Sequence, residues 1–260
     1  MTELLRITGL QIDYGSGHRA VDELNLSLAE GERLALIGET GSGKSTSALA
    51  IAGLLPADSV IRGEIGWPGF REPPRNGRDI GFVFQDAAAS LDPVMRVGDQ
   101  IAEVVATQRN LPWKASRERA AELLARVMLP EPRMMLDAYP HQLSGGQRQR
   151  ITIAAAIAAG PRLLIADEPT SALDTIVQAE IMRLIGSLVE EASMSLLLVT
   201  HDIALAAQHC DRITVMRHGR IVETGATARI VTQPVDPYTR TLIDACLTLD
   251  IDPDVEGPAR

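Results

Sequence analysis

The sequence predicts an α/β protein in which a parallel β-sheet forms the core, accompanied by an antiparallel β subdomain and an inserted α-helical subdomain. Three observations predict this fold. Short apolar segments at residues 33–37, 163–166 and 196–200 have the length and composition of buried strands. A helical pattern separates the last two segments, as in a βαβ unit. Residues 97–159 carry apolar side chains mostly at helical spacing.

The first strands are expected close to the N-terminus. Residues 4–10 and the alternating leucines of residues 24–28 predict antiparallel strands on either side of a turn at residues 14–19. The compact apolar strand at residues 33–37 then breaks into a glycine-rich turn, and the helical pattern that follows extends to residue 55. This order predicts a strand–loop–helix unit.

The later elements follow from turn residues and periodicity. Glycine and proline at residues 58–79 indicate a hairpin or an irregular excursion, and residues 80–84 form another strand candidate. Residues 212–224 predict a closing hairpin. Asp174 is a candidate N-cap for a helix. One apolar face of that helix is formed by Val177, Ile181, Leu184 and Leu188.

Composition and charge exclude several classes of protein. With 260 residues, of which 45% are hydrophobic, the chain can bury a sizeable core. A net charge of −9 repels phosphodiester backbones, so nucleic acid is not an expected partner. The longest apolar runs are far shorter than the roughly 20 residues that cross a bilayer, so no membrane span is expected.

The first residues and the cysteines add two expectations. Glu3 and Arg6 interrupt the apolar run that a secretory signal needs, which favours a cytosolic chain. Cys210 and Cys246 are too few for a disulfide framework and are not spaced as metal ligands. We therefore expect both to be buried or incidental thiols.

A phosphate-binding loop is the most specific motif in the chain. Residues 38–45 fit the pattern G-x-x-x-x-G-K-[ST] and lie between a strand and a helix. The glycines allow backbone N–H groups to surround phosphate oxygens, Lys44 adds a positive charge and Ser45 can hold magnesium. The bland alternative is a glycine-rich turn with a surface lysine. The candidate nucleotide-binding residues are Gly38, Glu39, Thr40, Gly41, Ser42, Gly43, Lys44, Ser45 and Thr46.

Two carboxylates follow the apolar strand at residues 163–166. Because successive side chains of a strand point to opposite sides, Asp167 and Glu168 can take separate roles. Asp167 can face magnesium, directly or through water, while Glu168 can face the water that attacks the γ-phosphate. Taken alone, the pair could also form a helix-capping turn.

A second candidate phosphate-binding element is LSGGQ, in which Ser144, Gly145, Gly146 and Gln147 precede a helical pattern. It lies a short distance before the Asp-Glu pair, and this order resembles that of the ATP-binding cassette (ABC) ATPases. The resemblance covers about residues 4–230. It implies a P-loop NTPase fold with a RecA-like sheet core, and ATP and Mg²⁺ as cofactors. A plain helix N-terminus with glycines is the alternative.

The resemblance also implies roles for single residues. Tyr14 lies where the family has an aromatic that stacks on adenine, although it could be an ordinary turn residue. Gln85 corresponds to a glutamine that contacts magnesium and the attacking water. His201 corresponds to a histidine that holds the γ-phosphate and orients Glu168. Asp174 belongs to a loop that crosses to a partner chain, and it can cap its helix as well.

One phosphate loop and one LSGGQ element imply a head-to-tail dimer with two nucleotides between the subunits. The resemblance divides the chain into an ATPase domain at residues 1–235, with a helical insertion at about residues 87–159, and a short extension at residues 236–260. The acidic stretch at residues 249–260 is expected to be a solvated end.

The finer resemblance is to importers of oligopeptides, dipeptides and nickel or nickel-like chelates. It is carried by GFVFQDAAASLDPV, YPHQLSGGQRQR and PVDPYTRTLIDA. Two departures are Ala87, where proline is frequent, and Asp236, where histidine commonly precedes PYTR. Longer members have a cysteine-rich tail, whereas this chain has no cysteine after Cys246, so no iron–sulfur cluster is expected. The compact length leaves peptide and metal-chelate cargo almost equally favoured.

The expected partners are a second, different ATPase subunit, transmembrane permease subunits and an extracytoplasmic solute-binding protein. The expected location is the cytoplasmic face of the membrane. The alternative is a soluble ABC ATPase that acts on nucleic acid or ribosomes. The acidic charge and the single set of motifs disfavour it.

Overall fold

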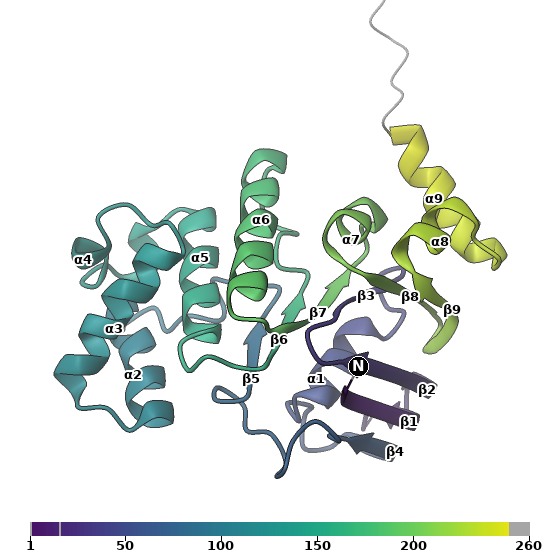
Figure 1. Ribbon diagram of the computed structural model, residues 1–260, viewed down its shortest axis with the longest axis horizontal. Coiled ribbons are helices and arrows are strands. Elements are labelled where there is room, and N and C mark those ends of the chain that lie inside the picture. Colours follow the sequence, from purple (N-terminus) through teal and green to yellow (C-terminus); the bar gives the residue numbers. More distant parts are fainter. Residues whose placement is uncertain (1, 16, 250–260) are drawn as a thin grey trace, which may run out of the picture.

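The computed structural model describes residues 2–15 and 17–249, and its centre is a six-stranded sheet (Figure 1). Its strand order is β5-β6-β7-β3-β8-β9. The strands from β5 to β8 are parallel, and β9 pairs with β8 in the antiparallel sense. The bounds are β3 Arg33–Ile37, β5 Ile80–Val83, β6 Leu163–Asp167, β7 Ser195–Thr200, β8 Arg212–Arg217 and β9 Arg220–Ala226.

A second sheet has three antiparallel strands in the order β2-β1-β4. Its strands are β1 Glu3–Asp13, β2 Arg19–Ala29 and β4 Val60–Gly66. The predicted antiparallel strands near the N-terminus are therefore confirmed. A local hairpin at residues 58–79 was one of two expectations, but the strand there pairs with β1 instead, and the rest of this stretch is irregular apart from isolated turns.

The helices between β5 and β6 are α2 Val97–Arg109, α3 Trp113–Arg126, α4 Pro132–Met135, the 3₁₀ helix η1 Pro140–Gln142 and α5 Gly145–Ala156. In Figure 1, α2, α3, α4 and α5 lie together at one side of the six-stranded sheet. The predicted helical region is thus confirmed. The remaining helices are α1 Lys44–Ile51, α6 Thr175–Glu191, α7 Ile203–His209, α8 Thr227–Thr232 and α9 Pro237–Leu249.

Helix α1 is shorter than predicted, because it ends at Ile51 rather than near residue 55. Gly53 takes φ +64°, which a right-handed helix cannot accommodate. Two other local predictions are confirmed. Asp174 caps α6 by accepting a hydrogen bond from the Val177 N–H. The β8–β9 hairpin turns at His218 and Gly219, which both have positive φ, as a two-residue type I′ turn requires.

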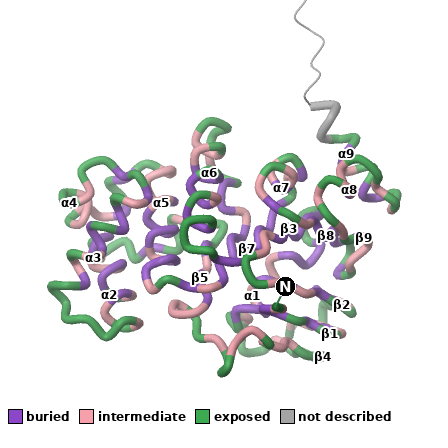
Figure 2. The backbone as a smooth tube through the Cα atoms, in the orientation of Figure 1, coloured by how far each residue is buried: buried purple, intermediate pink, exposed green. Residues whose placement is uncertain are grey.

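The core explains why the central strands read as continuous apolar runs. Alternate residues of each strand join one of two buried clusters on opposite faces of the six-stranded sheet. In β3, Ala35 and Ile37 belong to the cluster on the face where β3 contacts α7, whereas Leu34 and Leu36 belong to the cluster that contains α1 and the antiparallel sheet. Figure 2 shows buried residues along the central strands and exposed residues in the loops and along parts of the helices.

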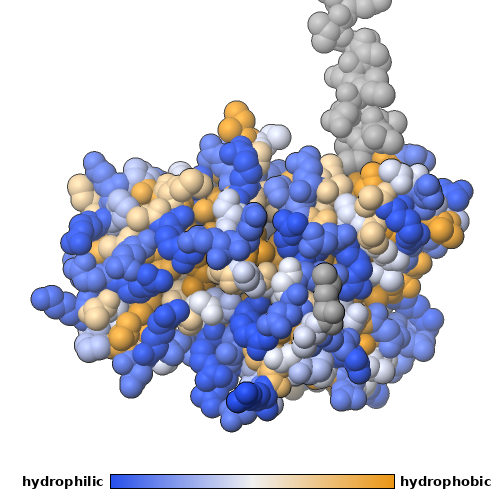
Figure 3. Space-filling model, viewed as in Figure 1, coloured by the Kyte–Doolittle hydropathy of each residue, from blue (hydrophilic) through white to orange (hydrophobic). Residues whose placement is uncertain are grey.

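The face of the molecule seen in Figure 3 is mainly polar. Hydrophilic side chains cover most of the face shown in Figure 3, with apolar residues in scattered groups. Among the described residues, no helix combines the length and the hydrophobicity needed to cross a membrane. Cys210 is buried, as expected, while the side chain of Cys246 and the stretch from residue 250 onward lie outside the part that the structure describes.

Candidate functional site

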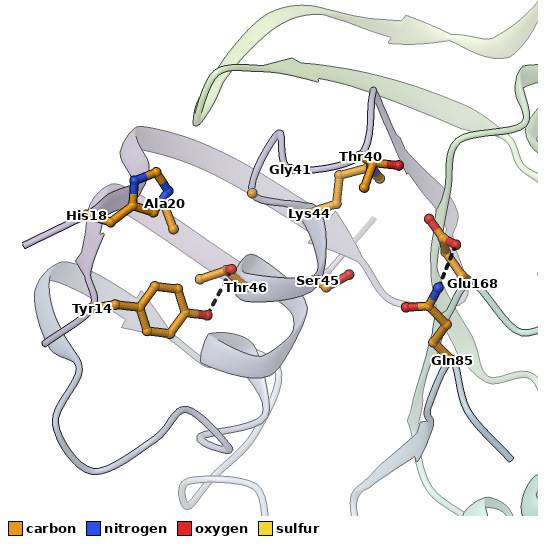
Figure 4. Close-up of a pocket in the computed structure, with 11 residues that line it drawn as sticks. Tyr14, His18, Ala20, Thr40, Gly41, Lys44, Ser45, Thr46, Gln85 and Glu168 are labelled. Carbon is orange, nitrogen blue, oxygen red and sulfur yellow. Dashed lines mark hydrogen bonds between the residues drawn. The ribbon is translucent and has the colours of Figure 1, made fainter. Parts of the chain in front are cut away.

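Four neighbouring strands end at one edge of the six-stranded sheet and deliver most of the predicted site residues there. The phosphate loop follows β3, Gln85 lies just after β5, Glu168 follows β6, and His201 follows β7. Ligand sites of open α/β sheets form at this carboxyl edge. A pocket of about 230 Å³ opens beside the loop (Figure 4). It is lined by Tyr14, His18, Ala20, Thr40, Gly41, Gly43, Lys44, Ser45, Thr46, Gln85 and Glu168.

Backbone conformation, and at Gly43 also close packing, explains the glycines of the loop. Gly41 and Gly43 have φ +81° and +101°, which side chains with a Cβ rarely adopt. A Cβ at Gly43 would lie 2.3 Å from the Ala20 carbonyl oxygen. The loop therefore wraps tightly and opens helix α1 at Lys44, where unpaired backbone N–H groups and the helix dipole attract anions.

Lys44 is buried and turned back onto the loop. Its Nζ donates to the carbonyl oxygens of Gly38 at 2.7 Å and Glu39 at 2.8 Å. Burial lowers the pKa of Lys44, and the nearby Glu168 and Asp167 carboxylates only partly oppose this shift. The two carbonyl oxygens are neutral, whereas phosphate oxygens are negatively charged. The Lys44 ammonium can therefore exchange these carbonyls for the stronger hydrogen bonds that phosphate oxygens accept.

Ser45 and Asp167 form a second pair beside the loop. The Ser45 hydroxyl donates to Asp167 Oδ1 at 2.9 Å. Burial raises the pKa of the Asp167 carboxyl, and the hydrogen bond from Ser45 acts against this rise. A hydroxyl and a carboxylate are hard oxygen ligands of the kind that magnesium takes, with further positions filled by phosphate and water. Within the described ranges, no three His, Cys, Asp or Glu side chains gather into a metal centre.

Glu168 sits at the centre of a polar cluster. Its Oε2 accepts a hydrogen bond from Gln85 Nε2 at 3.1 Å, and its Oε1 lies 3.3 Å from His201 Nδ1. The residue has φ +42°, an uncommon conformation for a side chain of this size. Such strain persists where the surrounding structure fixes it, and it is concentrated at functional sites.

The LSGGQ element lies apart from this pocket. Ser144 caps α5, because its Oγ accepts from the Gln147 N–H at 3.2 Å while Gln147 Oε1 accepts from the Ser144 N–H at 2.9 Å. Neither these two residues nor Gly145 and Gly146 line the pocket, and Asp174 also lies outside it. Within one chain, the pocket is therefore lined by the phosphate loop and not by the LSGGQ element.

Three further residues contact the loop or its pocket and were missed by the sequence reasoning. His18 and Ala20 line the pocket, next to Tyr14, whose hydroxyl lies 3.0 Å from Thr46 Oγ1. Tyr238 lies nearly 200 positions after the loop, yet its hydroxyl oxygen accepts a hydrogen bond from the Glu39 N–H at 3.0 Å. A motif search centred on the loop has no signal for such a distant residue.

Comparison with known proteins identifies the family. The family profile described as "ABC transporter" matches residues 21–171, a stretch that contains the phosphate loop, LSGGQ and the Asp-Glu pair. The chain belongs to the ABC transporter family. The resemblance noted from the sequence motifs is thereby confirmed.

Curated members of the ABC transporter family match almost the whole chain. The oligopeptide transport ATP-binding protein OppD of Bacillus subtilis is 41% identical over 96% of the chain and 74% of its own length. The dipeptide transport ATP-binding protein DppD of Haemophilus influenzae is 42% identical over 92% of the chain and 76% of its own length.

Solved structures confirm the ABC ATPase fold. A dimeric ATP-binding cassette in a post-hydrolysis state with ADP and Pi has a TM-score of 0.75 and 30% identity, and the match covers 86% of this chain and 99% of that one. CbiO1 of Clostridium perfringens, part of the ABC transporter complex CbiONQ, also has a TM-score of 0.75, with 28% identity. That match covers 96% of this chain and the whole of CbiO1.

Proposed function

We propose that this chain is the ATP-hydrolysing subunit of an ABC importer for peptides. The observation that carries the proposal is that Lys44, Ser45 and Glu168 line one pocket at the sheet edge, where Ser45 also donates a hydrogen bond to Asp167. Relatives at 41% and 42% identity are named for oligopeptide and dipeptide transport, which favours peptides over the nickel chelates that the sequence left open.

In this proposal the loop binds the triphosphate of ATP. Backbone N–H groups of residues 38–46 surround the phosphates, and Lys44 moves its ammonium from the Gly38 and Glu39 carbonyls to the β and γ phosphates. Tyr14 faces the adenine. Ser45 and Asp167, with Gln85, would hold magnesium, whose charge would offset that of the phosphates.

Hydrolysis requires a base beside the attacking water, and Glu168 takes this role. Its carboxylate accepts the proton of the water while the water oxygen bonds to the γ-phosphorus and the bond to the β-γ bridging oxygen breaks. Gln85 and His201 hold the two carboxylate oxygens and so fix the direction of the base. The products are ADP and phosphate.

The absence of the LSGGQ residues from the lining of the pocket supports a dimer as the working unit. Ser144, Gly145, Gly146 and Gln147 would reach the γ-phosphate on a second ATPase subunit, and Asp174 would lie near the same interface. ATP would then bridge two subunits, and its hydrolysis would remove the bridge. The helical insertion at residues 87–159 would carry LSGGQ, within an ATPase domain at residues 1–235.

The remaining partners follow from the importer assignment. Permease subunits would hold the chain at the cytoplasmic face of the membrane, and an extracytoplasmic solute-binding protein would deliver the peptide. A soluble cassette protein acting on nucleic acid or ribosomes is the second candidate. The net charge of −9 disfavours it.

The nucleotide site is tested by measuring ATP binding calorimetrically to variants of the two lysines in the chain. Lys44→Ala should abolish measurable ATP binding, whereas Lys114→Ala, at an exposed position of α3, should leave it unchanged. Equal ATP affinity of Lys44→Ala and the unmodified chain would refute the site.

The cargo is tested with the complete transporter complex, whose ATPase rate should rise with peptides and not with a nickel chelate.

A further inference from the structure

The C-terminal helix α9 is tied to the body of the protein by a specific set of hydrogen bonds. The buried carboxylate of Glu223 accepts from the backbone N–H groups of Val235 at 3.0 Å and Asp236 at 3.1 Å. Asp236 in turn accepts from the Tyr238 N–H at 2.8 Å and so starts the helix. Asp236 is one of the two departures from the family pattern, and here it acts as a cap.

This anchoring delivers Tyr238 to the phosphate loop. The Tyr238 side chain is almost completely buried, with 7% of the residue exposed. Its hydroxyl oxygen accepts from the Glu39 N–H, and the Arg217 guanidinium lies 4.7 Å above its ring. Figure 1 shows α9 beside α8 and β9, at the side of the molecule away from the helices between β5 and β6.

Tyr238 and Lys44 hold opposite ends of one peptide group. The carbonyl of the peptide that joins Gly38 to Glu39 accepts from Lys44 Nζ at 2.7 Å, and its N–H donates to Tyr238. Because a peptide group is planar, these two contacts fix its orientation. On a further side, β8 packs so closely that a Cβ at Gly38 would lie 2.1 Å from the Met216 carbonyl oxygen.

ATP would remove one of these two contacts. When Lys44 turns to the phosphates, the Gly38 carbonyl loses its donor. Among the side chains that the structure describes, Tyr238 alone then still holds the peptide. If this peptide could rotate, neighbouring N–H groups of the loop would turn away from the phosphates. Turning them back when ATP binds would cost free energy and so weaken ATP binding.

We propose that Tyr238 is a positioning residue of the nucleotide site. It holds the Gly38–Glu39 peptide in the orientation that binds triphosphate. Helix α9 thereby strengthens the binding of ATP to the phosphate loop, which lies about 200 positions earlier in the chain. The inference rests on the proposed ATP-binding function. It extends the site to a helix outside the matched family profile.

Tyr238→Phe is the decisive variant, because it removes the acceptor oxygen and keeps the ring beneath Arg217. We expect ATP to bind about fivefold more weakly to Tyr238→Phe, the effect of losing one ordinary hydrogen bond. Tyr139→Phe is the matched control, since Tyr139 is half-buried next to His141 and lies outside the pocket. It should bind ATP with unchanged affinity.

Hydrogen exchange gives a readout that does not need nucleotide. In the ATP-free chain the amide of Glu39 should exchange faster in Tyr238→Phe than in Tyr139→Phe, while amides of β1 stay unchanged. Equal ATP affinity of the two variants, or equal exchange at Glu39, would overturn the inference. Failure of the unmodified chain to bind ATP would instead refute the proposed function and the inference together.

Discussion

Replacing Glu168 with glutamine removes one negative charge and keeps the shape of the site. The Glu168 side chain is 13% exposed, and its two oxygens face Gln85 at 3.1 Å and His201 at 3.3 Å. A glutamine oxygen can accept from Gln85, and its NH₂ group can donate to His201. The positive φ strains both residues equally. The free energy of unfolding should therefore change by no more than about 0.5 kcal/mol.

The chemical effect should be far larger, because an amide cannot accept the proton of the attacking water. Loss of a general base lowers turnover by about 10²- to 10⁴-fold. We would measure phosphate release by the assembled transporter, ATP affinity by calorimetry and unfolding by urea. Glu103→Gln, which makes the same change in charge on the exposed face of α2, is the control and should retain full turnover.

Only one pattern of results supports Glu168 as the base: turnover falls steeply while ATP affinity and stability persist. If Glu168→Gln hydrolyses ATP within tenfold of the unmodified protein, the carboxylate is not the base. A parallel loss of stability would show that the cluster with Gln85 and His201 has a structural role instead.

Three further changes test other parts of the reasoning. Asp167→Asn should raise the free energy of unfolding at pH 7, because burial raises the pKa of this carboxyl and ionising it costs stability; the gain should shrink in urea titrations as the pH falls toward the ordinary value of 3.8. Ser144→Arg should leave ATP binding by the isolated chain intact and abolish hydrolysis by the dimer; weaker binding by the isolated chain would contradict a role on the partner's nucleotide. Asp174→Ala should lower the free energy of unfolding by about 1 kcal/mol through loss of the α6 cap, and an unchanged urea midpoint would contradict that role.

Elements with a strong local pattern could be predicted from the sequence. The central strands are short apolar runs because both faces of the sheet are buried, and the His218-Gly219 turn follows from the conformations that it needs. The spacing of the glycines, the lysine and the serine in residues 38–45 likewise predicts a phosphate loop between a strand and a helix. Each of these features is visible in the residue types of one short segment, even where the contacts of that segment are with distant parts of the chain.

Pairing between distant segments could not be predicted in this way. Nothing near residues 60–66 specifies β1 as their partner, because an exposed edge strand has a weak pattern of its own. Tyr238 is a similar case, since its contact with Glu39 depends on the Glu223 carboxylate and on the turn at Asp236. Periodicity describes one element at a time, and these contacts join several.

The position of β3 at the centre of the sheet also has a consequence for synthesis on the ribosome. Its two neighbours, β7 and β8, come from the last third of the chain. At roughly 5–20 residues per second, the stretch from residue 38 to residue 211 takes roughly 9 to 35 s to make. Throughout that interval the nascent apolar strand lacks its second hydrogen-bonded neighbour, so early protection of residues 33–37 has to come from α1 and the antiparallel sheet or from a chaperone.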